Sequence, residues 1–257
     1  MFGFCPLASG SKGNSIYFGS KETKVLIDAG LSYLQLQSRL SEIGVKLEDI
    51  DAILITHEHS DHIAGLKIIT EKLDIPVFTN SDTAKSIYNN LHIIPRFKIF
   101  STGEEFEFKD LKILPFSISH DTLDPVGFVI KMANLKCGFC TDFGFVSSLM
   151  KAILKDCDYL YVEANHQVSM VEACNRSYVY KQRVLSRQGH LSNIDCLKLL
   201  DEIIHPNLKH IHIAHISSEC NSKKLIEDMF LDFLKKKKSN TKFSLAHQDI
   251  ISKKIGF

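Results

Sequence analysis

The hexapeptide at residues 57–62, His-Glu-His-Ser-Asp-His, is the densest group of potential metal-binding side chains in the sequence. It offers three imidazoles and two carboxylates, which are the ligands of zinc and of other divalent metals. The run before it, Ala52-Ile-Leu-Ile-Thr56, is short, apolar and largely β-branched, as is typical of a buried strand. Apolar residues at roughly helical spacing follow from Ile63 to Leu73. The hexapeptide is therefore predicted to lie on a strand-to-helix loop.

The spacing within the hexapeptide indicates two adjacent metal ions. In an extended loop, His57 and His59 can turn to the same side and share one ion. Asp61 and His62 fall on the first helical turn and point elsewhere, so they would serve a second ion. Ser60 and Asp61 alone would be ordinary helix capping. Capping does not account for three histidines in six residues when the whole chain has 12.

Further polar residues stand where other predicted strands end. Asp28 would be either a turn residue or an acceptor that orients ligand histidines. His120 and Asp142, each considered alone, are more typical of a loop and a turn. Because the site predicted above still lacks ligands, we interpret both as ligands, together with His215.

The chain alternates strands and helices, except for a stretch of strands and turns from residue 97 to 142. Predicted strands cover 2–8, 15–19, 24–28, 52–56, 76–78, 97–100, 105–108, 111–116, 127–132, 135–141, 159–162, 209–214 and 242–246. Predicted helices cover 32–43, 63–73, 81–91 with Ser81 as its cap, 146–154, 189–204 with a Ser192–Asp195 capping box, and 223–236. The Gly-Ser loop at 9–14 is interpreted as a hairpin whose amides could still face a substrate. With no linker and no short repeat, we expect a single domain over 1–257, built of two similar halves.

Composition limits the partners. A formal net charge of +1 predicts neither a nucleic-acid nor a membrane partner, so a basic patch must be local. Residues 173–188 hold four basic side chains and no acidic one, interleaved with Tyr178 and Tyr180. This stretch is either a phosphate-contacting surface or a solvated helix face. Its basic residues are Arg176, Lys181, Arg183 and Arg187.

Cysteine usage and hydropathy point to the cytoplasm. The seven cysteines are scattered, mostly in apolar segments, and are predicted to be reduced core residues. Cys137 and Cys140 match a redox or zinc spacing, but residues three apart in a strand face opposite sides, which favours two core thiols. The N-terminus lacks a signal-peptide pattern, and no apolar run is long enough for a membrane span.

The set of Asp28, residues 57–62, His120, Asp142 and His215, in this order and each at a strand end, resembles the metallo-β-lactamase fold family. Narrower motifs resemble the YycJ/WalJ branch, which is related to tRNase Z and other nucleic-acid phosphodiesterases. These motifs are Ser9–Ser15, Thr141-Asp142, Glu163–His166, Gly189–Asn193 and Ala214–Ser217.

The resemblance implies an α/β fold, a four-layer αβ/βα sandwich with a dinuclear site along one edge. It places one metal ion on His57, His59 and His120 and the other on Asp61, His62 and His215. Asp142 would bridge the ions, and Asp28 would support them from outside the ligand set. The resemblance also assigns Glu163 and His190 to proton delivery. Candidate substrate contacts are Asn14, Asn165, Arg176, Lys181, Arg183 and Ser217.

These features predict a metal-dependent hydrolase, a phosphodiesterase or nuclease in which a metal-activated hydroxide attacks DNA or RNA. Asp61, Glu163 and His190 would be its catalytic residues. Zinc, manganese or iron suits the nitrogen and oxygen ligands. One alternative is a small-molecule hydrolase of a thioester, lactone or cyclic phosphodiester. Another is a non-catalytic nucleic-acid-binding regulatory module. The chain lacks the inserted arm of tRNase Z and the β-CASP insertion, and the sequence leaves the oligomeric state open.

Overall fold

The computed structural model describes all residues from 1 to 257, and their contacts divide the chain into two compact units. The first unit comprises Met1–Pro115, Thr122–Val126 and Ala246–Phe257. The second unit comprises Phe116–Asp121 and Gly127–Leu245. Each unit is described by itself below, and the single domain over 1–257 stays a prediction.

The first unit is built on a seven-stranded sheet of order β14-β1-β2-β3-β4-β5-β6. Strands β14 to β3 pair antiparallel, whereas β3 to β6 pair parallel. The carboxyl ends of β3 and β4 therefore lie side by side, and Asp28 and Thr56 follow them. The strands are β1 (Gly3–Ala8), β2 (Ser15–Gly19), β3 (Lys24–Ile27), β4 (Ala52–Leu54), β5 (Val77–Thr79), β6 (Phe97–Ile99) and β14 (Ile255–Gly256).

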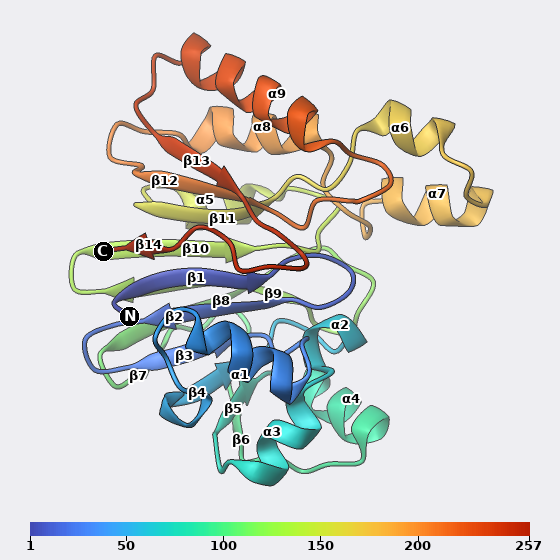
Figure 1. Ribbon diagram of the computed structural model, residues 1–257. Coiled ribbons are helices and arrows are strands. Elements are labelled where there is room, and N and C mark those ends of the chain that lie inside the picture. Colours follow the sequence, from blue (N-terminus) through green and yellow to red (C-terminus); the bar gives the residue numbers. More distant parts are fainter. The chain divides into compact units, whose positions relative to one another are not determined.

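Helices cover the sheet of the first unit (Figure 1). Leu36 and Leu40 of α1 and Leu66 of α3 pack into one apolar cluster with Leu26 and Ile53 of the strands. The helical segments are α1 (Tyr33–Ser41), the 3₁₀ turn η1 (Leu47–Asp49), α2 (Ser60–Ile63), α3 (Leu66–Lys72) and α4 (Ser81–Leu91).

Strands β7 (Phe106–Phe108) and β8 (Leu111–Ser117) form an antiparallel hairpin.

Two helix predictions in the first unit were wrong in detail. The helix predicted over 63–73 is divided, because α2 ends at Ile63 and α3 begins at Leu66. Gly65 lies between them, where a Cβ atom would stand 2.1 Å from the carbonyl oxygen of Leu31. This backbone approach leaves no room for a side chain. The cap of α4 is Asn80 rather than Ser81, since the Asn80 side chain accepts the amide of Thr83.

The sheet of the second unit runs in the order β13-β12-β11-β10-β9. Its strands are β9 (Val126–Met132), β10 (Leu135–Cys140), β11 (Tyr159–Glu163), β12 (His210–Ala214) and β13 (Lys242–Leu245). Strands β9 and β10 pair antiparallel, and β10 to β13 pair parallel. The carboxyl ends of β10, β11 and β12 therefore meet at one edge, which carries Asp142, Glu163 and His215.

In the second unit, α8 and α9 cover the sheet, while α6 and α7 form a pair that projects beyond the strand ends (Figure 1). This pair packs on its own small cluster of Val171, Val184 and Cys220. The α6 helix has no counterpart among the predicted helices. Ser192 caps α8 by accepting the amide of Asp195, as predicted. The helices are α5 (Ser148–Leu154), α6 (Val168–Ala173), α7 (Tyr178–Leu185), α8 (Asn193–Ile203) and α9 (Lys223–Lys236).

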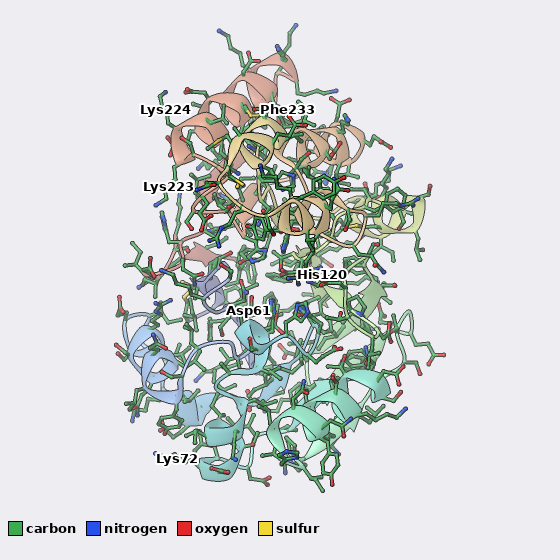
Figure 2. All side chains as sticks on the ribbon, turned by 90° about the vertical axis from the view of Figure 1, so that its right-hand side faces the viewer. Asp61, Lys72, His120, Lys223, Lys224 and Phe233 are labelled. Carbon is green, nitrogen blue, oxygen red and sulfur yellow. The ribbon has the colours of Figure 1, made fainter.

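The lysines of α9 are solvated surface residues. Lys223 and Lys224 lie on its first turn (Figure 2), and Lys224 pairs with Asp228 at 2.5 Å. At the other end of the helix, Lys236 pairs with Asp232 at 2.7 Å.

All seven cysteines are free thiols and six are buried, so the prediction of reduced core cysteines is confirmed. Burial raises the pKa of Cys137 and Cys140 well above the ordinary value, which keeps both thiols protonated. No helix has the length and hydropathy needed to cross a membrane.

Candidate metal and catalytic residues

Asp28 fixes the start of the hexapeptide loop. Its Oδ1 accepts the amide of Thr56 at 2.8 Å, and its Oδ2 accepts the Thr56 hydroxyl at 2.9 Å. The same Oδ2 lies 2.8 Å from Nδ1 of His62. Burial raises the pKa of Asp28, and the contacts with His62 and Thr56 work against that rise. Asp28 is thus the common acceptor that holds β3, the end of β4 and His62 together.

These contacts orient the imidazoles of His57 and His62. Because the Thr56 hydroxyl donates to Asp28, its oxygen can accept Nδ1–H of His57, which lies 2.9 Å away. Nδ1–H of His62 is used in the same way by Asp28. In both rings Nε2 then carries the lone pair, which is the atom that a metal requires. The two ring centroids are 3.9 Å apart, and His59 lies 4.9 Å from His57.

Asn14, a predicted substrate contact, lies against the hexapeptide within the first unit. Its Nδ2 is 3.1 Å from Oδ2 of Asp61 and 3.0 Å from Nε2 of His62. Its backbone amide donates to the carbonyl of Asp61 at 2.8 Å. Asp61 lies on the first turn of α2 (Figure 2). The predicted hairpin of β1 and β2 is confirmed. Asn14, which lies in its loop, positions Asp61.

Glu163 organises the corresponding edge of the second unit. Its Oε1 lies 2.9 Å from Nδ1 of His190 and 2.8 Å from Nδ1 of His215. Its Oε2 accepts the amides of Phe143 at 3.0 Å and Leu191 at 3.3 Å. Burial raises the pKa of Glu163, but the positive charge of His190 and the hydrogen bonds from both histidines outweigh it and lower the pKa to about 2. Glu163 is therefore a carboxylate whose two oxygens are both occupied by the chain.

Asp142 and His215 lie beside Glu163. Nδ1 of His215 is 3.1 Å from Oδ1 of Asp142. Because Nδ1–H of His215 is used by Glu163, the Nε2 atom of His215 is left as the ligand nitrogen. Asp142, Glu163, His190 and His215 bring one potential ligand atom each within 4.8 Å of one another. Glu163, Asp142 and His215 are buried, whereas the His190 side chain is 22% exposed. These four predicted residues of the second unit are thus gathered in one cluster.

His120 is held by backbone carbonyls. Its Nδ1 lies 3.1 Å from the oxygen of Gln188 and 3.3 Å from that of Gly189. Burial lowers the pKa of His120, so the neutral ring is favoured, with its proton on Nδ1. This is the tautomer of a metal-binding histidine that coordinates through Nε2.

Three of the predicted site residues have left-handed backbone conformations. Asp28 and Asp142 both have φ of 62°, and His215 has φ of 51°. Each directly follows or closely follows a strand. Such conformations are unfavourable for residues other than glycine and occur often at functional sites. The left-handed backbone directs each of these side chains toward the edge of its own unit at which the strands end.

Comparisons with known proteins agree with these features. The family model described as a beta-lactamase superfamily domain matches residues 23–213. This chain belongs to the metallo-β-lactamase fold family. Exodeoxyribonuclease YycJ of Bacillus anthracis is 37% identical over 224 residues, which cover 86% of this chain and 85% of that protein. Exodeoxyribonuclease WalJ of Streptococcus pneumoniae is 37% identical over 228 residues, covering 87% and 85%.

The fold is also that of solved family members. The metallo-β-lactamase fold protein YhfI of Bacillus subtilis matches with a TM-score of 0.73 at 14% identity, covering 96% of this chain and 97% of that one. This likeness confirms the predicted α/β sandwich. The YycJ/WalJ resemblance inferred from the motifs is confirmed by the two relatives above.

The donor sets of this metallo-β-lactamase fold chain suit divalent metal ions. Both units present imidazole nitrogens whose tautomer is fixed by a carboxylate, a hydroxyl or a carbonyl on Nδ1. Such outer contacts are the usual support of metal-binding histidines. Carboxylates of Asp61 and Asp142 accompany them, and hard oxygen with imidazole nitrogen suits zinc, manganese and iron. Divalent metal binding follows from the fold and these clusters.

The basic stretch is only partly available for a substrate. Arg176 pairs with Glu219, and Nε of Arg183 lies 2.6 Å from Oδ2 of Asp121. Nζ of Lys181 donates to the carbonyl of Glu172 at 2.7 Å. These contacts show that much of the charge serves the surface of α6 and α7. Phosphate contact by the three basic residues stays a prediction.

Asn165 and Ser217 make contacts inside the second unit. Nδ2 of Asn165 donates to the carbonyl of His215 at 2.6 Å, and the amide of Ser217 donates to the carbonyl of Asn165 at 2.9 Å. Asn165 thereby supports the strained backbone of His215. Contact of either residue with a substrate stays a prediction.

Sequence reasoning missed Thr56 and the pair of Arg187 and Phe145. Thr56 directly precedes the hexapeptide, and a hydroxyl at the end of an apolar strand was the signal that could have identified it. The guanidinium of Arg187 lies over the ring of Phe145 at 3.7 Å from the centroid. Phe145 and Arg187 are 42 positions apart in the sequence, and no sequence pattern indicates that they are in contact.

Proposed function

We propose that this chain is a metal-dependent phosphodiesterase that cleaves nucleic acid, and that its substrate is DNA. The observation that carries the proposal is the carboxylate of Glu163, which holds a predicted metal ligand, His215, and an exposed histidine, His190, on one oxygen. Two relatives of matching length, both named exodeoxyribonucleases, support DNA as the substrate.

The proposed ligand assignment divides the predicted ligands between two ions. His57, His59 and His120 would hold one ion, and Asp61, His62 and His215 would hold the other. Asp142 would serve both. This assignment rests on the family resemblance and on the tautomers that the hydrogen bonds within each unit impose.

Two divalent ions held by these residues would supply Lewis-acid chemistry: they would make water a nucleophile near neutral pH and would stabilise the charge that develops on the phosphate oxygens. Zinc or manganese is the proposed metal, and iron also suits these ligands.

The residues of the chain supply orientation and a proton. With Nδ1–H of His190 donated to Glu163, the imidazolium form presents Nε2–H as the acidic proton. We assign the protonation of the leaving oxygen to His190 and the orientation of both rings to Glu163. Glu163 is a positioning residue, because all of its acceptor contacts are made by the chain itself.

The test is a cleavage assay on end-labelled single-stranded DNA, double-stranded DNA and RNA with the manganese- or zinc-loaded protein. We expect DNA cleavage that is lost in His59→Ala. A model thioester and a lactone are assayed in parallel. Hydrolysis of either without nucleic-acid cleavage would contradict the proposal and favour a small-molecule hydrolase. Unfolding on metal removal, together with no hydrolysis of any substrate, would favour a regulatory binding module.

A further inference from the structure

Arg187 differs from the other basic residues between 173 and 188. Arg176 and Arg183 each face a carboxylate, of Glu219 and Asp121, and Lys181 donates to a carbonyl. Arg187 has no carboxylate partner in this structure and is exposed. Its guanidinium lies 3.7 Å from the ring centroid of Phe145, which is itself 39% exposed. One cation of the stretch is therefore held on an aromatic surface with its charge uncompensated.

The backbone ties this pair to the catalytic cluster of the second unit. Phe145 comes three residues after Asp142, and Arg187 comes three residues before His190. A residue of extended chain spans at most about 3.6 Å, so each lies within about 11 Å of that neighbour, Cα to Cα. The two loops also touch, because a Cβ atom on Gly144 would stand 2.2 Å from the carbonyl oxygen of Ser186. This close approach holds the loops of Phe145 and Arg187 together, beside Asp142 and His190.

Stacking leaves the hydrogen-bonding edge of an arginine available. The face of the guanidinium covers the ring, while its N–H groups lie in the guanidinium plane and point outward. A planar fork of this kind matches the oxygens of a phosphate group. Nucleotides along one strand of a duplex are spaced about 3.4 Å apart along its axis, so the upper limit of about 11 Å corresponds to about three nucleotides.

We infer that Arg187, held on Phe145, binds a backbone phosphate of the nucleic-acid strand, a few nucleotides from the bond that is cleaved. The inference rests on the proposed function and names a substrate contact that the hydrolytic residues do not provide. The phosphate accepts hydrogen bonds from the guanidinium N–H groups of Arg187, and stacking on Phe145 holds the guanidinium in place.

The cavity beside Phe145 does not account for phosphate binding. It encloses about 280 Å³ between Phe145, Leu191 and Leu199. Its lysines are neutralised, since Lys151 pairs with Glu202 at 2.6 Å and Lys198 pairs with Asp195 at 2.9 Å. Beside this cavity, Arg187 is therefore the cation without a carboxylate partner that an anionic strand would meet.

The experiment compares the metal-loaded full chain with Arg187→Ala on two substrates. One is a labelled DNA oligonucleotide, and the other is bis(p-nitrophenyl) phosphate, which has one phosphodiester and no neighbouring phosphate. We expect KM for the oligonucleotide to rise about 10- to 100-fold, because a hydrogen bond to a charged group is lost. Hydrolysis of the small diester should stay within twofold of the wild type. The slope of log affinity against log salt should fall by about 0.7, as for one phosphate contact on a single strand.

Two further variants separate binding from loop structure. Arg96→Ala removes the same charge from an exposed arginine that pairs with Asp74, and it should leave both assays unchanged. Phe145→Leu keeps the charge and removes the ring, so KM for the oligonucleotide should rise while the salt slope stays unchanged.

Each outcome decides one question. Equal loss on both substrates in Arg187→Ala would overturn the inference, because it would mean that the loop only supports the catalytic residues. An unchanged KM and salt slope for the oligonucleotide would also overturn it. If the wild type cleaves neither substrate, the proposed function fails instead.

Discussion

Replacing Glu163 by glutamine is expected to destabilise the protein and to misalign two histidines at once. Glutamine has the same shape, so the change tests hydrogen bonding and charge rather than packing. The glutamate accepts four hydrogen bonds, two on each oxygen, from His190, His215 and the amides of Phe143 and Leu191. The glutamine amide keeps one oxygen and places an NH₂ donor where the other stood. If the glutamine oxygen faces the histidines, the amides of Phe143 and Leu191 lose their acceptor. If the NH₂ faces the histidines, their Nδ1 atoms can accept only after each ring moves its proton to Nε2, the nitrogen that a metal requires.

The size of the effect follows from those two bonds. A hydrogen bond to a charged group contributes about 1.5–3 kcal/mol, so two of them amount to about 3–6 kcal/mol of the free energy of unfolding. For a chain of this size, each kcal/mol shifts the melting temperature by about 2–4 °C, which gives a fall of about 6–24 °C. The side chain is fully buried, so solvent does not replace the lost contacts.

The measurement is thermal unfolding of chelator-treated Glu163→Gln, so that metal affinity does not enter the comparison. Glu202→Gln is the matched control, because its carboxylate makes an exposed ion pair with Lys151, for which at most about 1 kcal/mol is expected. A melting temperature within about 2 °C of the wild type for Glu163→Gln, together with an unchanged metal affinity, would refute the four-bond account of this carboxylate.

Two further predictions concern His190 and Asp28. His190→Gln should lower kcat on DNA by about 10²–10⁴-fold, since a general acid is removed, while the bound metal content stays unchanged. Steady-state kinetics together with elemental analysis checks this, and an unchanged kcat would exclude His190 as the proton donor. Asp28→Asn should weaken metal affinity by about 10- to 100-fold, because His62 loses its carboxylate partner. Competition with a chromophoric chelator measures the affinity, and equal affinities would contradict the orienting role of Asp28.

Much of the site could be predicted because its residues stand at the ends of strongly apolar strands. Asp28, Asp142 and His215 each follow such a run, and the structure places them at the carboxyl ends of β3, β10 and β12. Strand ends are visible in a sequence because burial selects β-branched and aromatic residues. The side-chain identities then indicate the chemistry.

What could not be predicted depends on contacts between distant positions. The helical periodicity from Ile63 to Leu73 does not reveal that the carbonyl of Leu31 approaches Gly65 and interrupts the helix. The charges of Arg176 and Arg183 look equivalent to that of Arg187 until Glu219 and Asp121 are seen beside them. The short α6 was not predicted, because Val171 is its only buried residue and the sequence therefore shows no apolar periodicity there. The α6–α7 pair packs on a small cluster of its own.

The central claim is that bound divalent metal ions enable this chain to cleave phosphodiesters. The most direct test is a titration of chelator-treated protein with manganese or zinc, in which the cleavage rate of labelled DNA is followed against metal ions bound per chain. We predict no cleavage without metal and a rate that rises until about two ions are bound, as in a two-metal site. Cleavage by the metal-free protein at the rate of the loaded protein would contradict the claim.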